Sequence, residues 1–355
     1  MNKELTLIAR FLALLAALML AGLLALTITA FAAQRQFLRA EPYKAALLEV
    51  NAYERSPGIL AEFVATALDN SPTGLLGPLP IPNLTQQDLQ IFLTVFLPRD
   101  WLQSQTEVVI DRAIAGLTGE PAPVPTLLSL APLKEQLNSP AGTQALLAVI
   151  NQRPACEAGD LSAFTCGFNL QGDITCRPPS LNQQLCGAAI NAATAGIASL
   201  IPDQVELESL LALSEPLTAP LRDYAGRYAS AISLIAIYGW LAALLMLFAI
   251  TILGVRSFTG WLRWWGGPLL GAALCLLPVT ALTMLSPAWY VSALIGELRL
   301  SLPALAEVAA DVVEVLSQGL VLQLVIAMVI LSAAGAGMVA LSFVGPPVYR
   351  WFAQG

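Results

Sequence analysis

The sequence predicts a mainly α membrane protein, in which four transmembrane helices carry a large, mostly helical, disulfide-bonded extracytoplasmic domain with minor β structure. Its mean hydropathy is +0.70, and only 12% of its residues are charged, about half the share of a soluble protein. Four runs without a charged residue are each long enough to cross a bilayer core of about 30 Å as a helix. These runs are 11–34, 228–255, 264–296 and 315–349.

The run 228–255 separates an N-terminal part that is rich in polar residues from a C-terminal part that is mostly apolar. We therefore expect an outer domain between the first two spans and only short connections after them. In chain order we predict an N-terminal anchor (1–34), the outer domain (35–227), span two (228–255), an inner loop (256–265), span three (266–286), an outer loop with an amphipathic helix (287–318), span four (319–345) and an inner tail (346–355).

Basic residues near the ends of the spans predict the orientation, since Lys and Arg are enriched in cytoplasmic loops. If all four helices cross, one side receives five basic residues against Glu4 alone: Lys3, Arg10, Arg256, Arg263 and Arg350. The other side receives residues 35–227, with 11 basic against 19 acidic residues. We therefore expect a multi-pass protein of the plasma membrane with both termini in the cytoplasm. The acidic exterior argues against nucleic acid or anionic lipid head groups as partners.

The cysteines indicate the same compartment. Cys156, Cys166, Cys176 and Cys186 recur every ten residues in the outer segment, whereas Cys275 stands alone in the third span. An even set outside the cytoplasm predicts two disulfides, and the alternative is a zinc site, although zinc ligands usually lie closer together in pairs. Three pairings are open. We expect Cys275 to be an inert core residue.

The first 33 residues admit two interpretations. Lys3, Arg10, a Leu/Ala-rich run and the small residues of Ala30-Phe31-Ala32 resemble a cleaved secretory signal. The apolar run is longer than the 7–15 residues of a signal core, so we favour an uncleaved anchor.

Residues 35–118 read as four helices. Proline starts the first at Glu41-Pro42, the second follows Ser56-Pro57-Gly58, and Thr85-x-x-Asp88 caps the third. Asp100 is expected to cap the fourth. Between the second and third, residues 71–82 are rich in Pro, Gly and Leu, and we interpret them as a cover over the domain core rather than a lip that touches the bilayer or a partner.

The second half of the outer domain mixes short elements. Residues 124–130 alternate as a strand does, Ser139-Pro140 starts a helix, and 204–210 is a further strand candidate. Another helix is expected over 181–200. The cysteine-rich stretch 151–186 has little to bury, so disulfides would hold it.

The membrane half begins with a helix that runs from Leu217 into span two without a breaker, which predicts a stiff link to the domain. Aromatic residues around 258–265 are expected to lie at the head-group level. Gly267-x-x-x-Gly271 predicts close helix packing in span three, and the pairs Ala333/Gly337 and Ala336/Ala340 predict it in span four.

The sequence contains few of the residues and motifs that enzymes commonly use for catalysis. The chain has no histidine, which removes the commonest general base and most zinc sites, and it has no phosphate-binding or dinucleotide-binding glycine loop. No span carries an ionisable residue at its centre, although ion and proton pathways normally need one. Glu107 and Asp111 lie four residues apart on a helix and could form an acid/base or metal pair, but we interpret them as a solvated face. We expect no enzyme and no cofactor.

The stretch Leu97-Pro98-Arg99-Asp100-Trp101-Leu102, continuing through Val109-Ile110-Asp111 to Gly116–Glu120, resembles a segment of uncharacterised bacterial four-span membrane proteins. That resemblance implies no activity. The order of one span, a large outer domain and three spans is similar in topology to the permease half of macrolide-exporter-type ABC transporters.

Three acidic residues form a last feature of interest: Glu307, Asp311 and Glu314 share one helix face about a turn apart. The simple interpretation is a water-facing stripe, and the alternative is a docking surface for Arg222 and Arg227 or for a partner. The sequence thus predicts a membrane-anchored protein that binds a protein or an apolar ligand, or assembles with other copies, through its outer domain. The alternatives are a permease-like subunit that works with a separate ATPase and, less favoured, a hydrolase that uses Asp or Glu.

Overall fold

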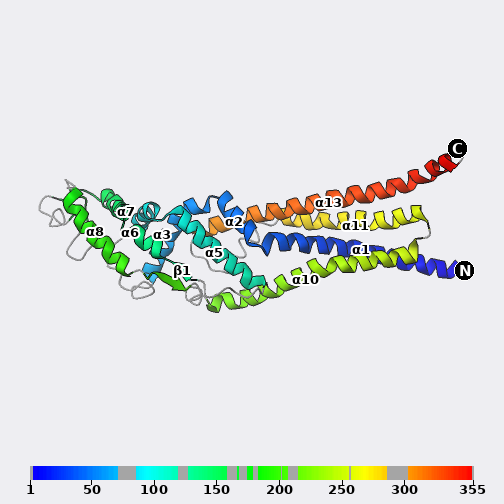
Figure 1. Cartoon of the computed structure of the whole chain (residues 1–355), viewed down its shortest axis with the longest axis horizontal. Coiled ribbons are helices and arrows are strands. Elements are labelled where there is room, and N and C mark those ends of the chain that lie inside the picture. The colour runs from blue at the N-terminus through cyan, green and yellow to red at the C-terminus, as the bar shows by residue number, and fades with distance from the viewer. Residues whose placement is uncertain are drawn as a thin grey trace.

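The computed structural model is elongated, with four long helices at one end and a group of short helices at the other (Figure 1). It describes residues 3–70, 85–118, 127–157, 166–167, 174–178, 183–200, 202–206, 215–255, 257–285 and 303–353. We call the long helices the bundle and the described elements between residues 38 and 206 the head. The proline-rich segment 71–82 lies outside the described residues.

The bundle consists of α1 (Lys3–Phe37), α10 (Glu215–Gly254), α11 (Phe258–Leu285) and α13 (Pro303–Ala353). All four are long and apolar enough to cross a membrane. They alternate in direction, so both chain termini and the turn between α10 and α11 lie at the end far from the head (Figure 1). The aromatic residues expected in an inner loop at 256–265 instead occupy the first turns of α11, where Trp261 stacks with Phe258 and lies tilted against Trp265.

In the bundle, many small side chains are buried and many large apolar side chains are exposed, which is the reverse of a soluble protein. Small residues, alanine above all, fill much of the bundle interior, including Ala13, Ala21, Ala236 and Ala272. Among the described residues, every exposed large apolar side chain except Leu48, Val95 and Val108 lies on one of the four long helices. Helices that associate in lipid bury small residues and leave large apolar ones on the outside, because lipid solvates those at no cost.

Two glycines bring α11 and α13 into contact. The carbonyl oxygen of each lies 2.9 Å from where a Cβ on the other would stand, so neither Gly266 nor Gly335 has room for a side chain. Of the predicted Gly267-x-x-x-Gly271 pair, Gly271 does face Ala21 of α1, but Gly267 borders open space, and its neighbour Gly266 makes the close contact instead. On α13, Gly337 also borders open space, and its expected partner Ala333 is exposed. Both members of the second expected pair, Ala336 and Ala340, are exposed as well.

The N-terminal helix is the centre of the bundle, since α1 contacts α10, α11 and α13. Leu20 is completely buried and belongs to a cluster with Ile250 of α10 and Ala272 of α11. The prediction that Cys275 is a core residue was wrong, because its side chain is exposed on the outer surface of α11. An apolar helix gives no sign of which face is turned inward when both faces are apolar.

The head begins with α2 (Ala40–Glu49) and α3 (Ala52–Asn70), separated by Asn51, which has a positive φ of 52°. The start expected after Ser56-Pro57-Gly58 was wrong, because Pro57 lies inside α3. Proline cannot donate to the carbonyl four residues earlier. The Ser56 hydroxyl donates to that carbonyl, the oxygen of Tyr53, at 2.7 Å and so takes the place of the missing donor.

Two further helices follow, α4 (Gln86–Phe96) and α5 (Arg99–Thr118). The predicted capping box is confirmed: Thr85 Oγ1 accepts from the Asp88 backbone N–H at 3.2 Å, and the Asp88 carboxylate accepts from the Thr85 N–H at 2.8 Å. Asp100 lies in the first turn of α5 rather than before it, since the helix begins at Arg99. α4 packs between α3 and α7.

The far end of the head contains α6 (Ala131–Leu137), α7 (Pro140–Gln152) and α8 (Gln183–Leu200). Strands β1 (Leu127–Ser129) and β2 (Gln204–Glu206) pair antiparallel, with Leu128 opposite Val205. Side chains of α7 and α8 form the core with the second disulfide, as Val149, Ile150 and Ile190 are completely buried there.

Both predicted disulfides are confirmed, and their pairing is Cys156–Cys176 and Cys166–Cys186. The two bridges interleave along the chain, and each joins residues 20 positions apart. Cys166 and Cys186 are 6% and 5% exposed and pack against α7, so this stretch uses the core of the neighbouring helices rather than one of its own.

Head and bundle are joined by continuous helices. The predicted stiff link is confirmed, since α10 runs unbroken for 40 residues, and α13 likewise runs unbroken for 51 residues. The first part of α13 contacts α2 and α3, and α10 contacts α5. At the start of α13, the backbone N–H of Ala304 donates to the Glu62 carboxylate of α3 at 3.3 Å.

Candidate functional site

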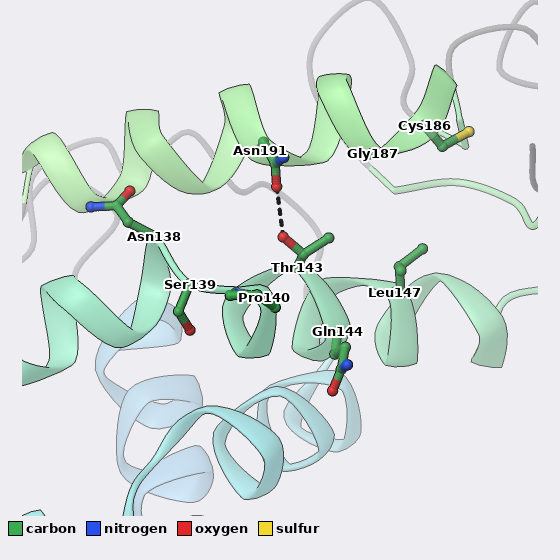
Figure 2. A pocket seen from close by; sticks show the side chains of 9 residues that line it. All are labelled: Asn138, Ser139, Pro140, Thr143, Gln144, Leu147, Cys186, Gly187 and Asn191. Carbon is green, nitrogen blue, oxygen red and sulfur yellow. Dashed lines mark hydrogen bonds between the residues drawn. The ribbon is translucent and has the colours of Figure 1, made fainter. Parts of the chain in front are cut away.

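The head contains a groove of about 450 Å³ between α7 and α8, near the end that points away from the bundle (Figures 1 and 2). Its floor and walls come from the turn between α6 and α7, from the first two turns of α7 and from the start of α8. The lining residues are Asn138, Ser139, Pro140, Thr143, Gln144, Leu147, Cys186, Gly187 and Asn191.

Local sequence explains the tight turn that opens the groove. Ser139 caps α7, because its hydroxyl oxygen accepts from the Ala141 N–H at 3.1 Å and its proton goes to the Gln136 carbonyl at 2.6 Å. Pro140 then occupies the first helical position, where no backbone donor is needed. A side chain on Gly142 would collide with the Leu137 carbonyl, so glycine is required for α6 to end so close to α7.

A hydrogen bond joins the two walls of the groove. Figure 2 shows Thr143 and Asn191 pointing toward one another, and the Thr143 hydroxyl donates to the Asn191 amide oxygen at 2.6 Å. At the start of α8, Cys186 is also held by its disulfide to Cys166, which packs against the core of α7. These two links restrain α8 relative to α7 and reduce the ordering needed when a ligand binds.

The chemistry of the groove is polar and uncharged. Its lining side chains are amides, hydroxyls and short apolar groups, and none of the nine ionises at neutral pH, because Cys186 is oxidised. Amides and hydroxyls both donate and accept hydrogen bonds, so they match the alternating N–H and C=O groups of an exposed peptide backbone. The arrangement is suited to binding rather than to proton transfer, which needs a titratable group.

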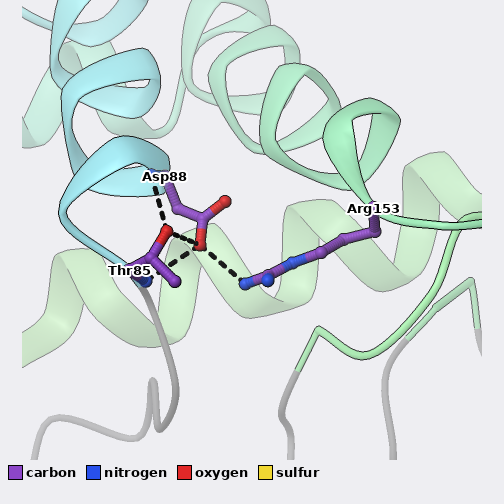
Figure 3. A network of polar contacts seen from close by, with 3 residues as sticks. All are labelled: Thr85, Asp88 and Arg153. Carbon is purple, nitrogen blue, oxygen red and sulfur yellow. Dashed lines mark hydrogen bonds and ion pairs between the residues drawn. The ribbon is translucent and has the colours of Figure 1, made fainter.

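A buried ion pair fixes α4 to the end of α7 (Figure 3). The Arg153 guanidinium donates to the Asp88 carboxylate at 2.7 Å, and the same carboxylate oxygen accepts from the Thr85 hydroxyl at 2.6 Å. The Asp88 side chain is only 6% exposed, so its charge depends on these donors. One acidic residue therefore both caps α4 and connects it to the chain that leads into the disulfides.

Glu107 and Asp111 are predicted to lie on a solvated face; Asp111 is 55% exposed, and α5 also packs against α2 and α3. Asp111 binds the Lys44 ammonium at 2.7 Å, and this hydrogen-bonded carboxylate raises the pKa of Lys44. Glu107 accepts from the Gln103 amide at 2.8 Å. Nearby, burial raises the pKa of Tyr53. Among the described residues, no group of three or more potential ligands could hold a metal ion.

The acidic stripe lies at the start of α13, where head and bundle meet. Asp311 binds Arg55 of α3 at 2.6 Å, Glu314 accepts from Gln318 at 3.3 Å, and Glu307 is exposed. A basic residue of the head, Arg55, thus docks on the stripe. Arg222 and Arg227 lie on α10; the side chain of Arg222 is outside the described part, and Arg227 is exposed, so their docking stays a prediction.

Sequence reasoning missed the partners that lie far apart along the chain. Arg153 and Asp88 are 65 positions apart, and Arg55 and Asp311 are 256 apart, so neither pair has a local signature. The groove residues Asn138, Thr143 and Asn191 were also missed, because neutral polar side chains on helix surfaces carry no motif. The only usable signal was the helix start at Ser139-Pro140, which places the turn that opens the groove.

Comparison with family models, with curated proteins and with solved structures finds no match to this chain. The resemblance to bacterial four-span proteins stays a prediction. Function is therefore argued from the geometry alone.

Proposed function

We propose that this chain is a non-enzymatic integral membrane protein that holds an acidic, disulfide-bonded head outside the cytoplasm, where the head binds a protein partner. The observation that carries the proposal is the division of the molecule. Exposed large apolar side chains gather on four long helices, whereas a neutral, hydrogen-bonding groove lies in the head, near the end that points away from those helices. A lipid bilayer suits the first surface and a peptide suits the second.

Three features support the orientation. Disulfides persist in oxidising compartments, and both bridges lie in the head. The chain termini and the turn after α10 share the far end of the bundle, and Lys3, Arg10 and Arg263, which are expected in the cytoplasm, lie on helix turns at that end. Finally, α1 forms the centre of the bundle, so it functions as a retained anchor and not as a signal that is removed.

The polar lining of the groove favours a peptide segment over an apolar ligand. An extended segment has unpaired backbone N–H and C=O groups that Asn138, Gln144 and Asn191 can bond. Because the groove lacks charge, it would select for backbone shape rather than for basic or acidic sequence. Assembly with further copies of the chain uses the same chemistry, with a peptide segment of a neighbouring copy as the ligand.

Single-cysteine labelling in a Cys275→Ser background tests the orientation. Ser104→Cys on the exposed part of α5 should react with an impermeant maleimide in intact cells. Ser257→Cys in the turn after α10 should react only once the inner face is opened. The reverse pattern would overturn the orientation.

Site-specific photo-crosslinking tests the binding site. A photoreactive residue at Asn138 in the groove should give a discrete crosslinked product in native membranes, and one at the exposed Thr118 of α5 should not. Thr143→Arg, which puts a long charged side chain into the groove, should abolish the product. Equal crosslinking at the two positions, or a product that survives Thr143→Arg, would contradict the assignment of the groove.

A permease-like subunit that works with an ATPase is the second candidate function. It is favoured by the unbroken helices α10 and α13, which connect the head mechanically to the far end of the bundle. Copurification in mild detergent separates the two functions, since only the second requires a nucleotide-binding subunit at the inner face.

A further inference from the structure

A hollow of about 380 Å³ lies between the end of α11 and the first half of α13, on the half of the bundle nearer the head. Two residues of α11 and six of α13 line it: Thr283, Met284, Glu314, Ser317, Gln318, Val321, Leu322 and Val325. It lies just below the acidic stripe, and Glu314 belongs to both.

A second, larger hollow of about 710 Å³ continues along the same two helices, between residues 270–277 of α11 and 328–333 of α13. Gln318, Val325, Val329 and Ser332 follow one another at helical spacing, so the two hollows lie on one face of α13. We call the two hollows together the seam. From Glu314 to Ala333 it extends about 28 Å at 1.5 Å per residue, close to the thickness of a bilayer core.

The seam changes in polarity along its length. Its polar side chains gather at the head end, where Glu314, Ser317, Gln318 and Thr283 stand together. Below them the lining is almost entirely apolar, and Leu322 and Leu274 are 60% and 67% exposed. A carboxylate above an apolar channel matches a molecule that has a cationic head and a long hydrocarbon tail.

The polar end offers hydrogen-bond acceptors and excludes anions. The acceptors are the Glu314 carboxylate and the Thr283 hydroxyl, which directs its proton to the Thr280 carbonyl at 2.8 Å and so keeps its lone pairs available. No basic side chain is among the eight lining residues. A primary ammonium, with three N–H donors and a positive charge, satisfies these acceptors, whereas a quaternary ammonium has no donor.

We propose that the seam binds a phospholipid with an ethanolamine head group, whose ammonium rests on Glu314 while one acyl chain lies along Val321 and Val325 into the second hollow. The inference rests on the membrane placement proposed above. The depth agrees with that placement, because Glu314 and Val325 are about 16 Å apart along the helix axis, roughly one leaflet of the hydrocarbon core. The lipid would come from the leaflet on the side of the head.

Native mass spectrometry of the detergent-purified full chain tests this site directly. Ethanolamine, choline and glycerol phospholipids with the same acyl chains are titrated in parallel, and the ethanolamine lipid should show the highest occupancy. Glu314→Gln should reduce its advantage over the glycerol lipid by roughly two- to fivefold, the size of a partly exposed charge contact. Glu307→Gln changes an exposed carboxylate two turns away and should leave the preference intact.

A second variant tests the apolar part of the seam. Val325→Trp fills the seam and should lower occupancy by all three lipids, whereas Ile330→Trp, at a 61% exposed position outside the lining, should not. Thermal unfolding of both variants without added lipid shows whether either has lost its fold. Equal occupancy by the three lipids, or an unchanged preference in Glu314→Gln, would overturn the proposal. The lipid assay is done in detergent, so a negative result there would not contradict the orientation, which cysteine labelling in intact cells tests separately.

Discussion

The head and the bundle are built by opposite rules. In the head, large side chains such as Ile150 and Ile190 are completely buried, and a disulfide closes the cluster that they form. In the bundle, alanine and glycine make up much of the interior beside a few large residues such as Leu20, while side chains such as Leu244 and Phe248 are 65% exposed. One chain therefore contains two packing schemes, which meet where Arg55 of α3 binds Asp311 of α13.

The difference reflects the solvent of each part. Removing apolar surface from water drives a core to collect large residues. Between helices in lipid that force is absent, so close backbone approach and van der Waals contact hold the helices together. It follows that the head should be sensitive to losing bulk and covalent links, whereas the bundle should be sensitive to gaining bulk.

Removal of the buried disulfide should have the largest effect. Cys166→Ser with Cys186→Ser releases a loop that joins residues 20 positions apart, which costs about 3 kcal/mol in the loop-entropy model, and it also places hydroxyls in an apolar cluster. Limited proteolysis should show the head cleaved while the bundle persists as a protected fragment.

Two controls sharpen that result. Cys156→Ser with Cys176→Ser opens a loop of the same span but should cost less, because Cys156 is only partly buried. Cys275→Ser should leave proteolysis unchanged, since this thiol is free and exposed. Cleavage within the bundle at the same rate as in the head would contradict the division.

The buried ion pair gives the next effect. Asp88→Asn keeps an acceptor for Thr85 but removes the carboxylate that binds Arg153, and we expect a loss of about 2–3 kcal/mol, below the full range for buried pairs because the Arg153 side chain is 19% exposed. Glu54→Gln is the matched control, as the pair of Glu54 and Arg99 is more than half exposed on both sides and should cost under about 1 kcal/mol. Chemical denaturation followed by near-UV circular dichroism measures both.

Added bulk tests the bundle. Gly335→Leu should lower stability in detergent by about 1–3 kcal/mol or more, because the side chain would collide with α11 at Leu270 and Gly266. Gly337→Leu adds the same side chain two residues further on, where the space is open, and should be tolerated. Equal thermal shifts for the two variants would mean that the helix contact is not where the glycines place it.

A smaller effect is expected where the two schemes meet. The hydroxyl oxygen of Tyr53 is buried without a hydrogen-bond partner among the described residues, so Tyr53→Phe should stabilise the chain by up to about 1 kcal/mol. Burial raises the Tyr53 pKa, and a raised pKa gives stability that is present below the unfolded value and lost as pH rises through the folded one. Thermal melts above about pH 10 should therefore fall less steeply for Tyr53→Phe than for the wild type.

The exposed pair at the junction should matter least. Arg55 and Asp311 are 44% and 38% exposed, so Asp311→Arg should cost only about 0.2–1 kcal/mol, and adding Arg55→Asp should recover part of it. A second set, Glu307→Lys and Asp311→Lys with Arg222→Glu and Arg227→Glu, tests the docking predicted from the sequence. Additive effects in that set, together with recovery in the first, would assign the stripe to α3 rather than to α10.

The sequence predicted those parts of the fold that depend on local chemistry. Charge-free runs located the four long helices, Thr85 and Ser139 located helix starts, and the lack of a breaker after Leu217 predicted the unbroken α10. Pro57 misled because the neighbouring Ser56 hydroxyl compensates for the missing donor.

The sequence was a poorer guide to which side of a helix points inward and to which distant residues contact one another. Gly266 was passed over for Gly267, and Cys275 was assigned to the core, because an apolar helix has no polar face to show which side points outward. The candidate groove joins residues from α7 and α8 that lie almost 50 positions apart, as the 48-residue separation of Thr143 and Asn191 shows. Such contacts follow from the three-dimensional packing and leave no periodic trace.

The unbroken α13 has a mechanical consequence. A helix of 51 residues is about 76 Å long, so tilting it by about 5° around one end would displace the other by about 7 Å. Its first turns are attached to α3 through Glu62 and Arg55, and its middle is clamped to α11 at Gly335. With a fulcrum at that glycine, the arm from Gly335 to the end of α13 is about 27 Å long, so the same tilt of about 5° would displace that end by about 2 Å.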